Sequence, residues 1–308
     1  MQETHTNKST NDFNDEIDLR ELFYVLSGGK WIIVSITAFV SIIAVIYSLL
    51  LPNIYESKAL LVPVNQSNSF SRSFGSYSSI AGLAGTGVSL PPANDDGNSL
   101  KAIEKIGSLS FFENNILPNI FLPDLMAVKS WNSKTNKVSF DKNIYDVNTN
   151  TWIEKPSVQK SFKAFQSKLI LNSNKKTGFV TLSIKHQSPF LAKQWVDLIV
   201  NEVNIFYRQK DKSKSEKAVT YLNQQISMTA LSEIQQVLAQ LLQEETKKLT
   251  LVEANQFYVF DYIDPPAVME QKSEPNRASI SILSALLSGI LSIILVLIRH
   301  YFFSKKNT

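Results

Sequence analysis

The sequence has no cysteine, which excludes several classes of site at once. None of the 308 residues is a cysteine, so disulfide bonds, thiolate nucleophiles and metal sites with cysteine ligands are ruled out. Histidine is scarce as well. His5, His186 and His300 lie in three separate regions, and no pair has the spacing of a metal-binding motif such as His-Glu-x-x-His. We therefore expect no metal site.

Motifs for nucleotide binding and for acid–base catalysis are also missing. Residues 82–90, GLAGTGVSL, are rich in glycine but contain no Gly-Lys-Ser/Thr, the part of a phosphate-binding loop that holds phosphate and magnesium. Two carboxylate pairs, Asp95–Asp96 and Asp261/Asp264, are of the type that acts on sugars. The first lies in a Gly/Asn-rich segment and the second borders a proline turn, so helix capping or solvation is the simpler interpretation. We expect no cofactor and no enzymatic activity.

Neither sign of charge is concentrated along the chain. The formal net charge is +4, and its lysines are scattered among Asn and Ser without a polybasic tract. Nucleic acid needs a concentrated basic face. The sequence therefore predicts no nucleic-acid partner.

Charge is missing altogether from residues 31–51 and 279–298, and each run contains 13 Ile, Leu, Val or Phe residues. At roughly −0.3 to −0.6 kcal/mol each, these residues favour insertion into a bilayer by about 4 to 8 kcal/mol per run. A buried core helix and a cleaved signal peptide are the alternatives for the first run. A signal peptide has a basic start, a shorter apolar core and a cleavage site, whereas residues 1–30 hold six acids and three bases. Both runs therefore predict membrane spans, and the first is expected to be an uncleaved signal anchor.

Two spans place both chain ends on one side of the membrane. Basic residues flank the terminal sides of the spans slightly more than the inner sides, which predicts cytoplasmic termini. The outer flanks hold Arg20, Lys30, Arg299, Lys305 and Lys306, against Lys58, Lys272 and Arg277 on the inner flanks. The predicted organisation is a cytoplasmic tail (1–30), a span (31–51), an extracytoplasmic domain (52–278), a second span (279–298) and a ten-residue cytoplasmic tail (299–308).

The segment between the spans is long enough for one domain with its own core. It begins with a strand at residues 55–64, buried on both faces and with Pro63 at its edge or end. A Ser/Gly/Asn-rich stretch, 65–99, predicts a mobile loop. Further predicted elements are a helix at 99–115 ended by Pro118, a strand near 138–145, and a β-hairpin formed by 169–171 and 180–185.

Proline and glycine are absent from residues 190–262. Ser188 and Pro189 form a typical helix start, and apolar residues then recur every three or four positions. One very long or lightly broken helix is predicted over about 189–258. Sixty helical residues span roughly 90 Å, so the helix must pack on an antiparallel segment of its own chain or on neighbouring subunits. The periodic positions are Val219, Leu222, Ile226, Ala230, Ile234, Val237, Leu241 and Leu249.

A final strand pattern follows at 259–268. Because the first and last strands both adjoin spans, they are expected to pair in a mixed sheet close to the membrane. The predicted fold class is α+β, with two transmembrane helices flanking a domain that has a sheet and a long extended helix.

Two surfaces are candidates for contacts with other molecules. Small residues on one face of the second span allow close helix packing in lipid, against the first span or a membrane partner, unless the serines are merely tolerated. They are Ser281, Ser284, Ala285, Ser288 and Ser292. The basic run 208–217 is either a solvated helix face or a contact surface for a neighbouring subunit or an anionic glycan. The candidate oligomer or glycan contacts are Lys210, Lys212, Lys214, Lys217, Glu244 and Glu245.

Four segments resemble the polysaccharide co-polymerases, the Wzz-type chain-length determinants of O-antigen and related surface polysaccharides. DEIDLRELFYVLSGGKWIIV (15–34) resembles the start of the family, with an acidic-Ile-Asp-Leu helix, Lys-Trp and the first span. IYESKALLVPV (54–64) is similar to the strand after that span, and SSIAGLAGTG (78–87) to the Ser/Ala/Gly segment beyond it. NQFYVFDYIDPPAVMEQKSEPNR (255–277) resembles the return strand and the proline-rich approach to the second span, with Pro265, Pro266, Pro275 and Arg277 as its motif. The family's prolines at three-residue intervals are only partly kept, because Met269 and Lys272 occupy two of their positions.

The resemblance implies a regulator in the bacterial inner membrane with a periplasmic domain. It implies a ring-like homo-oligomer that sets the length of the polymer made by a Wzy-type polymerase, with the growing glycan chain as a further candidate partner. An alternative is an adaptor for a separately encoded tyrosine kinase in capsule or exopolysaccharide export, for which the residues after the second span are few. A two-span sensor is a third interpretation, and it would need a compact ligand pocket instead of a long helix.

Overall fold

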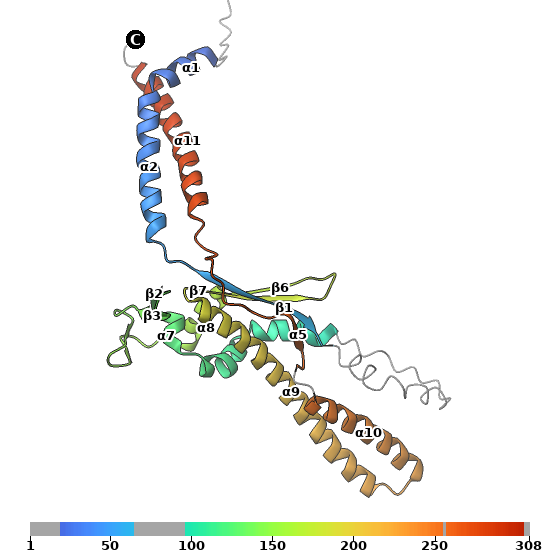
Figure 1. Cartoon of the computed structure of the whole chain (residues 1–308). Coiled ribbons are helices and arrows are strands. Elements are labelled where there is room, and N and C mark those ends of the chain that lie inside the picture. The colour runs from blue at the N-terminus through green and yellow to red at the C-terminus, as the bar shows by residue number, and fades with distance from the viewer. Residues whose placement is uncertain (1–18, 65–95, 255–256, 305–308) are drawn as a thin grey trace, which may run out of the picture. The chain divides into compact units, whose positions relative to one another are not determined.

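The computed structural model describes residues 19–64, 96–254 and 257–304 (Figure 1). The chain forms two compact units. The membrane-helix unit comprises residues 1–52 and 275–308, and the central domain comprises residues 53–274. The glycine-rich stretch 82–90, Asp95 and most of the predicted loop lie outside the described residues.

The membrane-helix unit contains α1 (Leu19–Gly28), α2 (Lys30–Leu50) and α11 (Arg277–Ser304), and α2 and α11 lie side by side (Figure 1). Residues 30–50 and 277–300 are long and apolar enough to span a membrane, with mean hydropathies of 2.5 and 2.6. Only 6% and 17% of their most apolar stretches are buried within the chain. Helices from the core of a soluble protein would be mostly buried, so the core-helix interpretation does not fit.

Four strands form the main sheet of the central domain, in the order β6-β7-β1-β8. The first and last strands pair as predicted, and Pro63 is the last residue of β1. All three pairings are antiparallel, so the expectation of a mixed sheet was wrong. The physical reason is that β7 and β8 run in the same direction but β1 lies between them, which leaves no two parallel strands as neighbours. The strands are β1 (Tyr55–Pro63), β6 (Leu169–Ser173), β7 (Val180–His186) and β8 (Phe260–Asp264).

Helix α9 (Pro189–Met228) begins directly after β7 and packs its first half on the sheet. Ser188 caps it as predicted, since its side chain accepts a hydrogen bond from the amide of Leu191, with Pro189 in the first turn. Apolar side chains on one face of α9 are buried against the strands, and three phenylalanines from other elements complete the core. The buried residues of α9 include Ala192, Trp195, Val196, Ile199, Val200 and Val203, and the phenylalanines are Phe111, Phe112 and Phe165.

The predicted helix at 99–115 is interrupted. Helix α5 (Asp96–Ile106) ends before Gly107, and Ser108 starts a new turn by accepting a hydrogen bond from the amide of Phe111 at 3.3 Å. The chain then continues through α6 (Leu109–Phe111), the π-helical turn η1 (Phe112–Ile116) and the 3-10 turn η2 (Leu117–Asn119). After these come α7 (Leu122–Met126), β2 (Val128–Asn132), β3 (Lys137–Phe140), β4 (Tyr145–Asp146), β5 (Thr151–Trp152) and α8 (Val158–Lys168).

The predicted helix over 189–258 is two helices that form an antiparallel hairpin, α9 and α10 (Ser232–Ala254) (Figure 1). The chain leaves helical geometry at Thr229, whose ψ is 125°. The side chain of Gln235 donates to the carbonyl oxygens of Ile226 and Thr229, at 3.4 and 2.6 Å, which satisfies two acceptors at the end of α9. Of the two predicted ways to cover the helix, the structure therefore shows the antiparallel segment of the same chain.

Candidate functional site

The small residues predicted on the second span face α2 within the same chain. Ser288 and Ser292 are buried, and the Oγ of Ser292 lies 3.5 Å from the Oγ1 of Thr37. The serines of α11 also donate to carbonyl oxygens of their own helix, so their hydroxyls are not left unpaired in an apolar setting. The acceptors are Arg277 for Ser281, Ser281 for Ser284, Ala285 for Ser288 and Gly289 for Ser292. This geometry fits a small-residue packing face; its part in assembly stays a prediction.

The backbone of Gly29 lies close to the side chain of Val296. A Cβ atom on Gly29 would lie 2.5 Å from one methyl carbon of Val296 and 3.2 Å from the other. It would also lie 3.4 Å from the carbonyl oxygen of Val25. The absent side chain at position 29 thus lets α11 reach the junction of α1 and α2.

In the proline-containing approach to the second span, Arg277 belongs to the start of α11, whereas the three prolines precede that helix. Arg277 begins α11 and donates from Nε to the carbonyl oxygen of Ser48 at 3.2 Å, an acceptor in the last turn of α2. Pro265 and Pro266 follow β8, and Pro266 is buried. Pro275 follows Glu274, whose carbonyl oxygen accepts from the amide of Ile54 at 2.9 Å.

The approach segment is held by hydrogen bonds along β1, even though Met269 and Lys272 replace two prolines. The Oγ of Ser57 donates to the carbonyl oxygen of Ala267 at 2.8 Å. Farther along, the amide of Ser273 donates to the carbonyl oxygen of Ile54 at 2.8 Å. Backbone pairing therefore supplies order that proline would otherwise provide.

The α9–α10 hairpin gives two of the predicted charged residues, Lys212 and Glu245, partners on the facing helix of the same chain. Lys212 forms an ion pair with Glu253. Glu245 accepts hydrogen bonds from Ser215 at 3.1 Å and from Lys248 at 2.6 Å. Burial alone would raise the pKa of Glu245, but the bonds to Lys248 and Ser215 and the charge of Lys214 together lower it.

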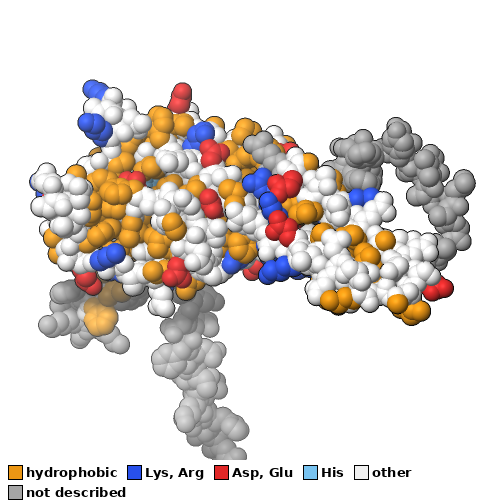
Figure 2. Space-filling model, turned by 90° about the horizontal axis from the view of Figure 1, so that it is seen from below, with side chains coloured by type: hydrophobic (Ala, Val, Ile, Leu, Met, Phe, Trp, Pro, Cys, Tyr) orange, Lys and Arg blue, Asp and Glu red, His pale blue; other side chains and the backbone are white. Residues whose placement is uncertain are grey.

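The other charged candidates lie on the surface of the hairpin. Lys210 lies over the ring of Tyr207, 5.6 Å from its centroid, and Lys214, Lys217 and Glu244 are exposed. Figure 2 shows acidic and basic side chains interspersed on the face it presents, without a region of one sign. Contacts of these residues with a neighbouring subunit or a glycan stay a prediction.

Sequence reasoning assigned one apolar stripe to the hairpin, whereas α10 has two. The inner stripe faces α9 and consists of Leu238, Leu242, Leu249 and Val252. The outer stripe is exposed and consists of Ile234, Val237 and Leu241 on α10, together with Leu231 just before the helix. The adjacent apolar pairs Val237–Leu238 and Leu241–Leu242 were the available indication of a second stripe. An exposed row of large apolar side chains is typical of an interaction surface.

Asn204 is a buried polar residue that sequence reasoning missed. Its Oδ1 accepts hydrogen bonds from the amides of Tyr258, Val259 and Phe260, at 3.1, 2.7 and 3.0 Å, while its Nδ2 donates to the carbonyl oxygen of Phe260 at 2.9 Å. One side chain of α9 thus fixes the start of β8. Its partners are more than fifty residues away in the sequence, so no local pattern could have revealed them.

Both ring nitrogens of the buried His186 form hydrogen bonds with the backbone, which indicates a structural role. Its Nδ1 accepts from the amide of Ser188, so Nε2 carries the proton and donates to the carbonyl oxygen of Asp124 at 2.9 Å. Burial lowers the pKa of His186 to about 4, which keeps the ring neutral. Among the described residues no group of three or more His, Asp or Glu side chains could hold a metal ion. Asp261 lies inside β8 and accepts a hydrogen bond from the amide of Tyr262 at 2.7 Å, so it caps no helix.

Asp124 gives the central domain a predicted pH dependence. Burial raises the pKa of its carboxyl group to about 6, whereas an unfolded aspartate titrates near about 3.9. The folded state therefore binds more protons between these values, and stability falls as the pH rises from about 4 to 6. Replacing Asp124 by asparagine is expected to increase the free energy of unfolding by about 1 kcal/mol at pH 7.5, a value discounted for partial exposure. At pH 4 no gain is expected.

Thermal unfolding of the full chain at both pH values measures this difference. Asp264→Asn is the matched control, because Asp264 is an exposed carboxylate at the end of β8. An equal effect of Asp124→Asn at the two pH values would contradict the role assigned to burial.

A family model agrees with the resemblance found in the sequence. Residues 15–106 match the family model described as chain length determinant protein, Wzz. The match covers α1, α2, β1 and α5, which confirms the resemblance to the Wzz-type family over this part of the chain. No curated protein matches the sequence.

Two solved structures are similar to parts of the chain. One is a full-length bacterial polysaccharide co-polymerase, with 15% identity, a TM-score of 0.42, and coverage of 93% of this chain and 99% of that chain. The other is a fragment of WzzB, a polysaccharide co-polymerase from Salmonella Typhimurium, with 11% identity, a TM-score of 0.34, and coverage of 72% of this chain and all of that chain.

Proposed function

We propose that this chain is a polysaccharide co-polymerase that regulates the length of a surface polysaccharide. The family match over residues 15–106 is the observation that carries the proposal, because it includes the first candidate span and the first strand of the sheet. The finer proposal is that the polymer is the O-antigen of lipopolysaccharide and that the chain is a scaffold for a Wzy-type polymerase, without catalysis of its own. No feature of the described residues favours the alternative of a tyrosine-kinase adaptor.

The proposed location is the bacterial inner membrane. Residues 31–51 and 279–298 span it, both tails are cytoplasmic, and residues 52–278 are periplasmic. The two apolar helices and the slight excess of basic residues on the terminal flanks support this topology. In this arrangement the exposed apolar side chains of α2 and α11 meet lipid or a membrane partner such as the polymerase.

The proposed assembly is a ring-like homo-oligomer that uses the outer stripe of α10. The side chain of Val237 at the middle of this stripe is 56% exposed, and Ile234 and Leu241 are nearly as exposed. A row of large apolar side chains in contact with water is unfavourable. A partner that covers the row would gain roughly 25 cal/mol of free energy for each Å² of apolar surface that it buries. A neighbouring hairpin offers the same stripe, so a second copy covers it with matching chemistry. Figure 2 shows hydrophobic side chains exposed at the end of the hairpin, at the right of the view.

Lipopolysaccharide from a strain that lacks the protein, separated on a gel, tests this function. Loss of the modal cluster of bands with short chains remaining is expected, and the wild-type gene restores the cluster. An unchanged ladder would reject the function, and a complete absence of polymer would point to synthesis or export.

The same assay examines the outer stripe through Val237→Asp. We expect this variant to fold, because position 237 is exposed and such changes cost within about 0.5 kcal/mol, yet to leave the modal cluster unrestored. Gln236→Asp is the matched control, since Gln236 is exposed on the same helix outside the stripe. Full restoration of the modal cluster by Val237→Asp would contradict the proposed role of the outer stripe in assembly.

A further inference from the structure

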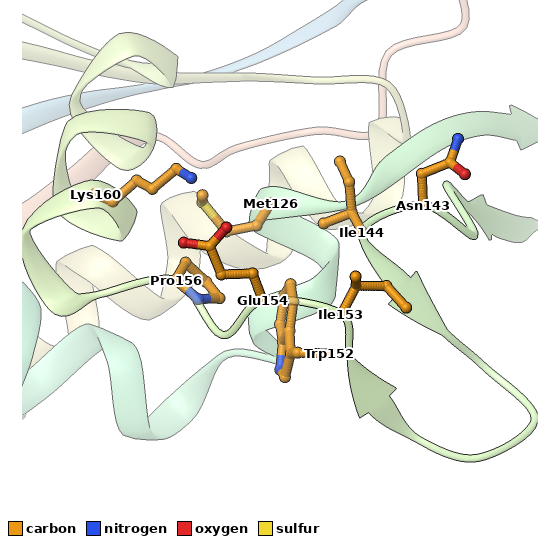
Figure 3. Close-up of a pocket in the computed structure, with 8 residues that line it drawn as sticks. All are labelled: Met126, Asn143, Ile144, Trp152, Ile153, Glu154, Pro156 and Lys160. Carbon is orange, nitrogen blue, oxygen red and sulfur yellow. The ribbon is translucent and has the colours of Figure 1, made fainter.

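A small cavity opens on the central domain between α7, the β4–β5 hairpin and α8 (Figure 3). Its volume is about 250 Å³. This is slightly below the roughly 300 to 1,000 Å³ of clefts that hold drug-sized ligands, so the cavity suits one small ring. The lining residues are Met126, Asn143, Ile144, Trp152, Ile153, Glu154, Pro156 and Lys160.

The polar groups at the cavity have unused hydrogen-bonding capacity. Glu154 and Lys160 both line the cavity, and both are exposed. Neither forms an ion pair with the other or with any other described residue. In Figure 3 the two side chains reach toward Met126 from opposite sides, Glu154 from the segment after β5 and Lys160 from α8. Asn143 lies beyond Ile144 in Figure 3, and its amide is directed away from the other lining residues. A carboxylate only accepts and an ammonium only donates.

An aromatic side chain in a fixed position completes the lining. Trp152 pairs across the hairpin with Tyr145, and their ring centroids are 5.1 Å apart. Tyr145 is itself buried, and its hydroxyl donates to the Oδ1 of Asn150 at 3.1 Å. The indole of Trp152 is therefore held before any ligand arrives, and it presents a large apolar surface with one polar edge.

These groups match the two-sided chemistry of a sugar. A pyranose ring has an apolar face of C–H groups, which packs on an aromatic side chain. Its hydroxyl groups both donate and accept, and so bind a carboxylate and an ammonium group at the same time. A simple anion such as phosphate would be attracted by Lys160 but repelled by Glu154, so a neutral polyhydroxylated ring fits the lining better.

We propose that this cavity binds one neutral hexose ring of a glycan. Trp152 packs on the ring, Glu154 accepts from a hydroxyl, and Lys160 donates to a hydroxyl. The proposal deepens the function proposed above and rests on it, because the glycan would be the polymer whose length the protein regulates. Since the cavity holds one ring, binding is weak for a single unit and gains from repetition along a polymer and across subunits.

Saturation-transfer NMR with the full chain in lipid nanodiscs tests the site. The probes are the methyl glycosides of glucose, galactose, mannose and rhamnose, and the polymer released by mild acid from the lipopolysaccharide of the producing strain. We expect transfer to at least one of these probes. Lys160→Ala and Glu154→Gln should each weaken binding about tenfold, as the loss of a hydrogen bond to a charged group predicts.

Lys163→Ala is the matched control, because Lys163 is exposed on the same helix but does not line the cavity. Trp152→Phe keeps an aromatic ring in the hairpin and should retain binding, whereas Trp152→Ala should abolish it. No transfer with the wild-type chain, or equal binding by Lys160→Ala and Lys163→Ala, would overturn the site.

The two proposals fail in different ways. If the wild-type chain binds no probe but the deletion strain still loses the modal cluster, the sugar site is overturned and the regulatory function stands. If the chain binds a probe through Lys160 and Glu154 but the deletion strain keeps an unchanged ladder, the regulatory function is overturned and the sugar site stands.

Discussion

Replacing Asn204 by alanine is expected to lower the free energy of unfolding of the central domain by about 3 to 4 kcal/mol. The change removes three hydrogen bonds to the amides of residues 258–260 and one to the carbonyl oxygen of Phe260. Each buried group left unpaired costs about 1 to 3 kcal/mol. Partial rearrangement of the backbone makes the total smaller than the sum.

Denaturant unfolding of the full chain in detergent, followed by circular dichroism, measures this loss. Asn201→Ala is the matched control, since Asn201 lies one turn earlier on α9 and is exposed. The control should change the free energy of unfolding by no more than about 0.5 kcal/mol. Equal effects of the two substitutions would show that Asn204 does not hold the start of β8.

Gly29→Leu is expected to break the close contact between α11 and the junction of α1 and α2. Even a Cβ atom would lie 2.5 Å from a methyl carbon of Val296, and a valine side chain has little rotational freedom with which to move aside. Forcing extra atoms into a packed contact costs about 1 to 3 kcal/mol. In lipid no hydrophobic driving force between the helices offsets this cost.

The absence of native cysteine allows a direct measurement. Thr37→Cys and Ser292→Cys replace two hydroxyls that lie 3.5 Å apart, and oxidation should link α2 to α11 in membranes. Proteolysis of the central domain then reports the disulfide, because the terminal fragments stay joined. Gly29→Leu should reduce this cross-linking severalfold.

Two further variants make the interpretation specific. Gly28→Leu is the control, because a Cβ at position 28 meets no atom within 4 Å, and it should leave cross-linking unchanged. Combining Gly29→Ala with Val296→Ala should restore what Gly29→Ala alone loses. Without such a rescue the effect of position 29 would have to come from another contact.

The elements that could be predicted from the sequence depend on local patterns. The two apolar runs are long enough to be recognised without any partner, and they form the two candidate spans. Ser188 caps α9 and Pro189 lies in its first turn, both of which are typical of a helix start. β6 and β7 are joined by a short turn in which Gly178 has a φ of +72°. In each case a few neighbouring residues suffice to determine the structure.

What could not be predicted depends on residues far apart in the sequence. The turn after Met228 contains neither proline nor glycine, and it forms because α10 packs on α9 and Gln235 satisfies the end of that helix. For the outer stripe of α10 the sequence predicted packing on the same chain or on a neighbouring subunit, because periodicity does not tell which of two adjacent apolar rows the chain itself covers. The residues of the cavity were not recognised, since Asn143, Trp152 and Lys160 come together only through the β4–β5 hairpin and α8.

The central position of β1 in the sheet has a consequence for biosynthesis. β1 emerges from the ribosome directly after the first apolar helix, yet its neighbours are β7 and β8, and β8 is made only after the whole α9–α10 hairpin. Non-local pairing of this kind has a high contact order and is slow to form. Both edges of β1 therefore stay unpaired through much of synthesis, when a nascent chain is most open to aggregation and to chaperones.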